Sequence, residues 1–171
     1  KFFWLFTGSH VVLWTLIPTL TNPNPPLDVI EGYVWGNEWL LGTYKHPPMQ
    51  AWVLEILAFV TQRAPWAHFL ASQLAIALAF WAVWKTGRKI FDEKKALLSV
   101  LCLEVIPYYN YTSSEFNPNV LLIGWWALIA FCFYKSMTEN RLIHWIGLGI
   151  CSACGLYSKY FTVLFLAILG L

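Results

Sequence analysis

Two carboxylates and an indole lie on one side of an expected short helix in the stretch PLDVIEGYVWGNEWLLG, which covers residues 26–42. Asp28 and Glu31 are three residues apart, so they share a helix face, and Trp35 continues the same stripe. A carboxylate beside an indole suits a carbohydrate, because the flat ring covers C–H surface while the carboxylate accepts hydrogen bonds from hydroxyls. The three residues therefore predict a sugar-binding surface.

The same spacing also fits a purely structural role. An Asp-x-x-Glu pattern can begin a helix, with Asp28 as the N-cap and Glu31 reaching back to the cap. Spacing alone favours this capping interpretation for Asp28, whereas Glu31 can serve in both roles. Tryptophans also gather at membrane interfaces, which accounts for their number in this stretch but not for their position beside the acids.

The stretch continues as Tyr44-Lys45-His46, followed by two prolines that fix the backbone and open a helix. A cation and an imidazole near a helix N-terminus form a site for an anion such as a phosphate. A solvated interfacial lysine beside a structural histidine is the competing interpretation.

Further polar residues lie at the ends of apolar runs or inside them. The stretch SSEFNPN contains Glu115, Asn117 and Asn119, which either bind substrate or, in the case of Asn117, begin a helix before the following proline. Lys159 follows a helix end, from which a lysine can snorkel outward. Glu104 stands inside an expected span, where ionisable groups are functional candidates, and the sequence identifies no partner for it.

The composition indicates an integral membrane protein of the all-α class, a polytopic bundle of helices. Hydrophobic residues make up 58% of the chain and charged residues 12%, whereas soluble domains carry about 25% charged residues. The net charge of +2 gives no reason to propose a nucleic acid partner. All four cysteines lie in apolar runs, and the C-x-x-C spacing has no second pair, so no disulfide framework is expected.

Spanning the hydrocarbon core takes roughly 20 apolar residues. The expected spans cover residues 2–20, 65–86, 94–111, 118–135, 142–158 and 159–171, with an outer loop and interfacial helices over 21–64. The chain starts without Met inside one apolar run and stops inside another. We therefore expect residues 1–171 to be the N-terminal portion of one transmembrane domain whose C-terminal remainder is missing.

Basic residues in the loops predict the orientation. If the N-terminus is cytoplasmic, eight basic residues lie inside: Lys1, Lys85, Arg88, Lys89, Lys94, Lys95, Lys135 and Arg141. Three lie outside: Lys45, Arg63 and Lys159. This bias predicts that the loop over 21–47 faces outward, which in a bacterial inner membrane means the periplasm.

The loop resembles the first outer loop of the polyprenyl-phosphate-dependent membrane glycosyltransferases of the GT-C fold. These include protein O-mannosyltransferases and the lipid A aminoarabinose transferase. The resemblance rests on Asp28-x-x-Glu31, Trp35 and GTYKHPPMQAW, and on the later stretches FNPNVLLIGWWAL (116–128) and GLYSKYFTVLFL (155–166).

The resemblance implies an enzyme that transfers a monosaccharide from a polyprenyl phosphate to an acceptor hydroxyl at the outer face, with inversion. Asp28 would be the general base and Glu31 its support, while Lys45, His46 and Lys159 would bind the donor phosphate. A carboxylate can take the proton of an attacking alcohol, and fixed cations stabilise a departing phosphate. The acceptor is a lipid, a glycan or a protein, and the other partners are membrane lipids.

The chain departs from the family pattern in two places. Many members have adjacent Asp-Glu, whereas two residues separate Asp28 from Glu31 here. The aminoarabinose transferases carry a metal-binding glutamate just before the Lys-Pro-Pro of this loop, and no carboxylate stands there in this chain. The metal ligands are therefore unassigned, and a divalent metal ion is an alternative to direct phosphate contact by Lys45 and His46.

A second class of function is a membrane transporter or flippase for a lipid-linked or polar substrate, in which the carboxylates and Lys159 would line the path. Transporter acids are expected near mid-membrane at broken helices. Five of the nine acids are expected at or near the outer face instead, which favours chemistry at the interface over transport: Asp28, Glu31, Glu38, Glu55 and Glu115. A non-catalytic accessory subunit is a third alternative, and the stripe of acids and indoles argues against it.

Overall fold

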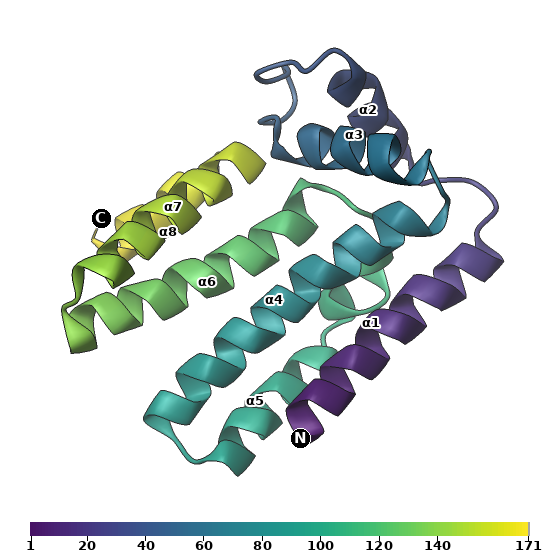
Figure 1. The fold of residues 1–171 in the computed structure, drawn as a ribbon. Helices are drawn as coiled ribbons and strands as arrows, with labels where there is room; N and C mark the ends of the chain where they lie inside the picture. The colour runs from purple at the N-terminus through teal and green to yellow at the C-terminus, as the bar shows by residue number, and fades with distance from the viewer. Residues whose placement is uncertain (171) are drawn as a thin grey trace.

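The computed structural model describes residues 1–170, and this part of the chain folds into helices and turns without a β-strand (Figure 1). The α-helices are α1 (Phe2–Thr21), α2 (Leu27–Asn37), α3 (Met49–Thr61), α4 (Trp66–Ile90), α5 (Glu93–Glu104), α6 (Pro118–Glu139), α7 (Leu142–Ser158) and α8 (Thr162–Leu169). Two short 3₁₀ turns, Pro107–Tyr109 and Thr112–Ser114, lie between α5 and α6. The expected all-α class is confirmed.

Three helices, α1, α4 and α6, are long and apolar enough to cross a membrane. They run alternately up and down with α5 and α7, while α2 and α3 lie together across one end of the bundle (Figure 1). The basic ends of α4 and α6 and the N-terminus of the chain lie at the opposite end. The segment that contains α2 and the basic ends of α4 and α6 therefore lie at opposite ends of the bundle.

The helix expected over residues 94–111 is shorter in the structure, because α5 ends at Glu104. Pro107 has no N–H to continue the helical hydrogen bonds and disfavours helical backbone in the residue before it. Asn110 then donates its carboxamide N–H to the backbone carbonyl of Glu104. The residues up to Pro118 form a turn-rich segment that runs from beside α4, where Tyr109 stacks on Phe80, to the end of the bundle that carries α2 and α3 (Figure 1).

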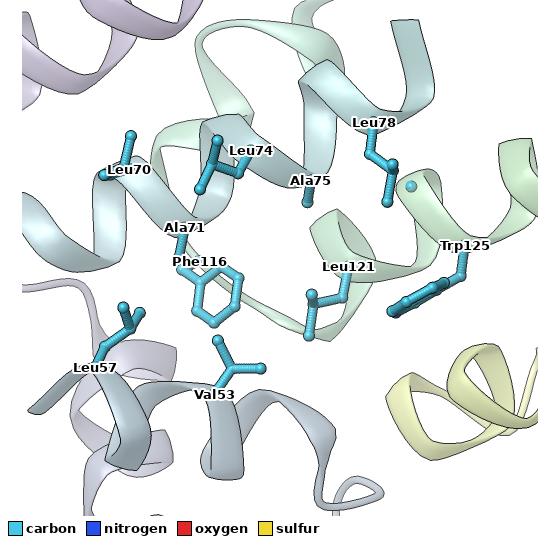
Figure 2. Close-up of a pocket in the computed structure, with 11 residues that line it drawn as sticks. Val53, Leu57, Leu70, Ala71, Leu74, Ala75, Leu78, Phe116, Leu121 and Trp125 are labelled. Atoms are coloured by element: carbon cyan, nitrogen blue, oxygen red, sulfur yellow. The ribbon is translucent and has the colours of Figure 1, made fainter. Parts of the chain in front are cut away.

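An apolar groove of 290 Å³ lies between α3, α4 and α6 (Figure 2). Val53 and Leu57 of α3 form one wall, and leucines of α4 form another. Phe116 and Leu121 lie between these walls. The groove therefore begins close to the end of the bundle that carries α2 and contains only apolar side chains.

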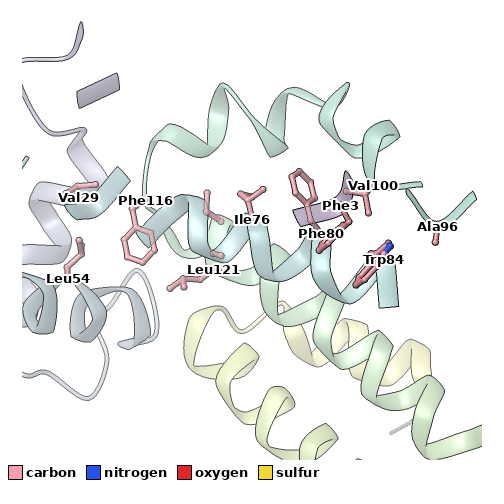
Figure 3. Packing of buried hydrophobic residues seen from close by; sticks show 12 residues of the cluster. Phe3, Val29, Leu54, Ile76, Phe80, Trp84, Ala96, Val100, Phe116 and Leu121 are labelled. Atoms are coloured by element: carbon pink, nitrogen blue, oxygen red, sulfur yellow. The ribbon is translucent and has the colours of Figure 1, made fainter. Parts of the chain in front are cut away.

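The core contains large aromatic side chains packed between α1, α4 and α5 (Figure 3). Phe3 stacks on Trp84 with ring centroids 4.2 Å apart, and Phe80 stacks on Tyr109 at 5.9 Å. The same cluster extends through Phe116 to Val29 of α2. The outer-loop helices therefore share one hydrophobic core with the spanning helices.

Two glycines allow α2 to approach α3 closely. A Cβ atom on Gly36 would lie 2.5 Å from the backbone carbonyl oxygen of Ala51, and one on Gly32 would lie 2.4 Å from Leu54 Cδ1. Real Cβ atoms do not reach such distances. A methyl group at position 36 would therefore push the helices apart, whereas the flexible end of Leu54 could move away from one at position 32. The Gly-x-x-x-Gly spacing places both glycines on the same helix face, and that face sets the position of the whole outer loop.

We expect Gly36→Ala to destabilise the protein, because the new methyl group meets backbone that cannot rotate away. Overpacking of this kind typically costs about 1–3 kcal/mol, which exceeds the roughly 0.5–1 kcal/mol that alanine gains over glycine in a helix. Thermal unfolding of the full-length protein in detergent measures the change. Gly149→Ala is the matched control, since nothing lies within 4 Å of that position in α7; equal unfolding midpoints for both variants would contradict the close packing.

Candidate active site

A tight turn presents Lys45 at the open side of α2. The Thr43 hydroxyl accepts hydrogen bonds from the backbone N–H groups of Lys45 (3.3 Å) and His46 (3.0 Å). The Thr43 N–H in turn donates to the His46 carbonyl at 3.0 Å. Pro47 and Pro48 follow directly and are buried, so the turn is fixed at both ends.

Lys45 lies between the two acids of α2. Its Nζ is 2.6 Å from Glu31 Oε2 and 3.3 Å from Asp28 Oδ1. Hydrogen bonds to Glu31 and then to Asp28 raise the pKa of Lys45, so the ammonium group stays charged through the physiological range. The structure therefore brings together one cation and the two carboxylates that the sequence places on one helix face.

Asp28 is not the cap of α2, so the capping interpretation is wrong. The helix begins at Leu27 with Pro26 in the N-cap position, and no side chain caps its N-terminus. The Asp28 backbone N–H instead donates to Glu115 Oε1 at 3.4 Å, and its carboxylate faces Lys45. The carboxylate is half-buried and open to a ligand, as a residue of an active site must be.

A buried glutamine fixes Asp28 against the bundle. Gln50 of α3 is 2% exposed, and its Nε2 donates to the backbone carbonyls of Asp28 (2.8 Å) and Phe116 (2.9 Å). One side chain thus connects α2, α3 and the segment before α6. The sequence analysis missed Gln50, because a single glutamine in an apolar helix gives no signal of its partners.

The start of α6 carries the asparagines that the sequence singled out. Asn117 is buried and caps the helix, since its Oδ1 accepts from the N–H groups of Asn119 (3.0 Å) and Val120 (3.2 Å). Asn119 Oδ1 accepts a hydrogen bond from Lys159 Nζ. Lys159 therefore turns toward the bundle in this structure, with Asn119 as its partner, rather than extending outward alone.

His46 lies among positive charges. Burial lowers its pKa, and the nearby Lys159 and Lys45 lower it further against the opposing effect of Asp28 and Glu31. A pKa below the ordinary 6.5 leaves the imidazole neutral at pH 7. The positive charge of the site at neutral pH therefore comes from the two lysines, and His46 is a neutral hydrogen-bonding group.

The aromatic residues flank these charges. Trp35 meets Tyr44 edge to face, with ring centroids 6.4 Å apart, and Tyr44 is 94% exposed. Trp52 donates its indole N–H to the Leu40 carbonyl at 3.0 Å, which holds the loop after α2. Trp35 follows Glu31 by four residues, so its ring lies on the helix face that carries the carboxylates.

The partner of Glu104 is His10 of α1, whose Nδ1 lies 2.8 Å from Glu104 Oε2. His10 Nε2 lies 3.0 Å from Gln73 Oε1, and Gln73 Nε2 lies 3.3 Å from the Ser113 carbonyl. This buried network connects three helices to the segment that carries Glu115. Within residues 1–170, no three His, Cys, Asp or Glu side chains come together in a way that could hold a metal ion.

We expect Gln50→Met to lower stability and activity together. Methionine has a similar length but no N–H, so it leaves two buried carbonyls unpaired, a loss of about 1–3 kcal/mol. Thermal unfolding and turnover of the full-length protein measure both effects. Gln50→Glu should be worse, because a carboxylate oxygen would face the carbonyls of Asp28 and Phe116. Wild-type values for both variants would show that these hydrogen bonds do not hold Asp28.

The chain is similar to the lipopolysaccharide core galacturonosyltransferase RgtA of Rhizobium johnstonii, with 22% identity over 158 residues. The alignment covers 91% of this chain and 32% of the relative, so the chain spans about a third of that protein's length. No solved structure matches the chain.

The sequence model of one family, described as dolichyl-phosphate-mannose-protein mannosyltransferase, matches residues 45–170. The matched range contains Lys45, Glu115 and Lys159, whereas Asp28 and Glu31 precede it. The match confirms the resemblance drawn from the outer loop. Because it extends over most of the sequence, the chain belongs to the dolichyl-phosphate-mannose-protein mannosyltransferase family.

Proposed function

We propose that this chain forms part of a glycosyltransferase that moves a monosaccharide from a polyprenyl phosphate to an acceptor hydroxyl at the outer face of the membrane, with inversion. The observation that carries the proposal is the position of Lys45 between Asp28 and Glu31. The Lys45 ammonium group, which would bind the phosphate, lies 3.3 Å from the Asp28 carboxylate, which would act as the base for the hydroxyl.

Asp28 takes the proton of the acceptor hydroxyl as the oxygen attacks the anomeric carbon of the sugar. The bond from that carbon to the phosphate oxygen breaks on the opposite side, so the configuration inverts and the lipid phosphate leaves with the bonding electrons. A positioned carboxylate typically contributes about 10²–10⁴-fold to such a step. Glu31 orients Lys45, with which it makes the shorter contact.

Lys45 and Lys159 bind the donor phosphate in this proposal. The leaving phosphate gains negative charge as the bond breaks, and fixed cations stabilise that charge more in a partly dry site than in water. Lys159 approaches from the end of α7 and Lys45 from the turn before α3. Both lysines lie close enough to His46 to lower its pKa, after the larger effect of burial.

The apolar groove between α3, α4 and α6 supports a lipid-linked donor (Figure 2). Phe116 lines the groove. Gln50 donates hydrogen bonds to the carbonyls of both Phe116 and Asp28, so the groove and Asp28 are held by the same side chain. A prenyl chain in the groove would bury apolar surface at about 25 cal/mol per Å². The chain would then lie along the bundle while its phosphate reaches the lysines.

The proposed orientation has α2 and α3 at the periplasmic face of a bacterial inner membrane. It rests on the eight-to-three distribution of basic residues between the two ends of the bundle. An impermeant thiol reagent should label an Asn37→Cys variant in intact cells. A Glu93→Cys variant, at the opposite end, should react only after the membrane is opened. The reverse labelling pattern would overturn an outer-leaflet donor.

We expect Asp28→Asn in the full-length enzyme to fold normally and to lose at least ~10²-fold in turnover. Asparagine keeps the size of the side chain but cannot take a proton at neutral pH. Glu31→Gln should lose less, because its role is to orient Lys45. Sugar transfer from a polyprenyl-phosphate donor, together with thermal unfolding, measures both quantities.

Lys45→Ala serves as the companion variant for this measurement. It should weaken donor use roughly ten- to a hundredfold, the range of a charge-assisted hydrogen bond, and should leave the fold intact because Lys45 is exposed. Near wild-type turnover of Asp28→Asn would move the search for the base to Glu31, Glu38 and Glu115.

A further inference from the structure

A second polar hollow lies on the side of α2 that faces away from Asp28. It has a volume of 110 Å³ and lies where the α1–α2 connection meets the turn between α3 and α4. Tyr33 lines it and is five residues from Asp28, which is about 140° around the helix at 3.6 residues per turn. The hollow is therefore separate from the candidate active site.

The polar groups around this hollow are donors or neutral. The polar lining residues are Asn22, Asn24, Tyr33, Arg63 and His68. Among residues 1–170, no carboxylate lines it and no salt bridge or side-chain hydrogen bond occupies the Arg63 guanidinium. Arg63 lies over the Tyr33 ring at 5.6 Å, so its donors remain available to an anion.

His68 supplies an independent observation. It is 3% exposed, lines the hollow, and its Nε2 is buried without a hydrogen-bond partner. Buried polar groups in proteins are normally paired. The ring of His68 therefore forms part of the wall of the hollow, and the hydrogen-bonding capacity of its Nε2 is unused in the protein interior.

The turn that carries Arg63 is strained. Gln62 (φ 53°) and Arg63 (φ 59°) both have left-handed backbone. One left-handed residue is the usual end of a helix, and Gln62 fills that position after α3. The left-handed backbone of Arg63 is not required to end the helix, and non-glycine residues rarely adopt a left-handed conformation. Such conformations gather at functional sites, and here the effect is to place the guanidinium between two hollows.

The second of these hollows has a volume of 420 Å³ and shares Tyr33 and Arg63 with the first. Asn37 and Glu38 contribute a carboxamide and a carboxylate, while Ile30 and Val34 form its apolar side. A carboxylate repels a phosphate but accepts hydrogen bonds from hydroxyls. The two hollows together therefore match a ligand with an anionic group at one end and hydroxyls at the other.

We propose that the paired hollows around Arg63 bind a phosphate ester that carries a hydroxylated group, with the phosphate beside Arg63, Asn22 and Asn24 and the hydroxyls beside Asn37 and Glu38. A glycerol phosphate, either free or as the headgroup of a membrane lipid, has this chemistry. The site is independent of the proposed sugar transfer, because it uses none of the residues assigned to that reaction.

The test measures the thermal unfolding of the full-length protein in phosphatidylcholine nanodiscs as phosphatidylglycerol is added. A parallel series in detergent adds free glycerol phosphate. Arg63→Asn removes the charge but keeps a residue that tolerates left-handed backbone, so the fold should survive. Gln62→Asn is the matched control, since it makes the same replacement one residue earlier, outside both hollows.

We expect phosphatidylglycerol to raise the unfolding midpoint of the wild type and of Gln62→Asn. The apparent affinity of Arg63→Asn should be at least roughly tenfold weaker, and Arg63→Lys should recover part of it. A rise with free glycerol phosphate would identify a soluble ligand, and a rise with the lipid alone would identify a headgroup. Equal affinities of Arg63→Asn and wild type, or no response of the wild type to either compound, would overturn the site.

Discussion

A single buried amide connects the outer loop to the helical bundle. Gln50 donates to the carbonyl of Asp28 and to that of Phe116, so α2 cannot move without breaking a hydrogen bond in the core. Gly32 lies against the same side chain, since a Cβ atom there would lie 3.1 Å from Gln50 Nε2 and would require the amide to shift by a few tenths of an ångström. The position of the Asp28 carboxylate thus depends on the interior of α3 rather than on the exposed loop around it.

Charge balance explains how the site can be held ready. Lys45 pairs with Asp28 and Glu31, while Lys159 lies on a neutral asparagine. The charges of the two lysines and the two carboxylates balance, so no uncompensated charge is left in a partly buried site. A donor phosphate adds negative charge, and both lysines can turn to it. The carboxylates would then lose part of their contact with Lys45, so donor binding would free Asp28 for the acceptor hydroxyl.

The sequence predicted the parts of the site that depend on local spacing. The shared face of Asp28 and Glu31, the helix after Pro48 and the helix start at Asn117 all follow from rules about neighbours along the chain. The prediction that Asp28 caps the helix was wrong because Pro26, two residues earlier, takes the N-cap position. The early end of α5 also follows from a local rule, because Pro107 interrupts the hydrogen bonds of a helix.

Contacts between distant residues could not be predicted in this way. Gln50 and Phe116 are 66 residues apart, and His10 and Gln73 are 63 apart. Glutamines and histidines in apolar helices signal that a partner exists, because unpaired polar groups are costly there. The pairing itself is set by helix packing, which one sequence does not reveal.

Hydrogen-bond roles in the buried network show why its members must be these residue types. Gln73 donates through Nε2 to the Ser113 carbonyl, so its Oε1 must accept from His10 Nε2–H. His10 Nδ1 then lies 2.8 Å from Glu104 Oε2. The imidazole gives the carboxylate a close partner among the spanning helices, where an isolated charge is costly. The network fixes Ser113, two residues before Glu115, and so holds the wall of the active site opposite α2 by interactions formed deep inside the bundle.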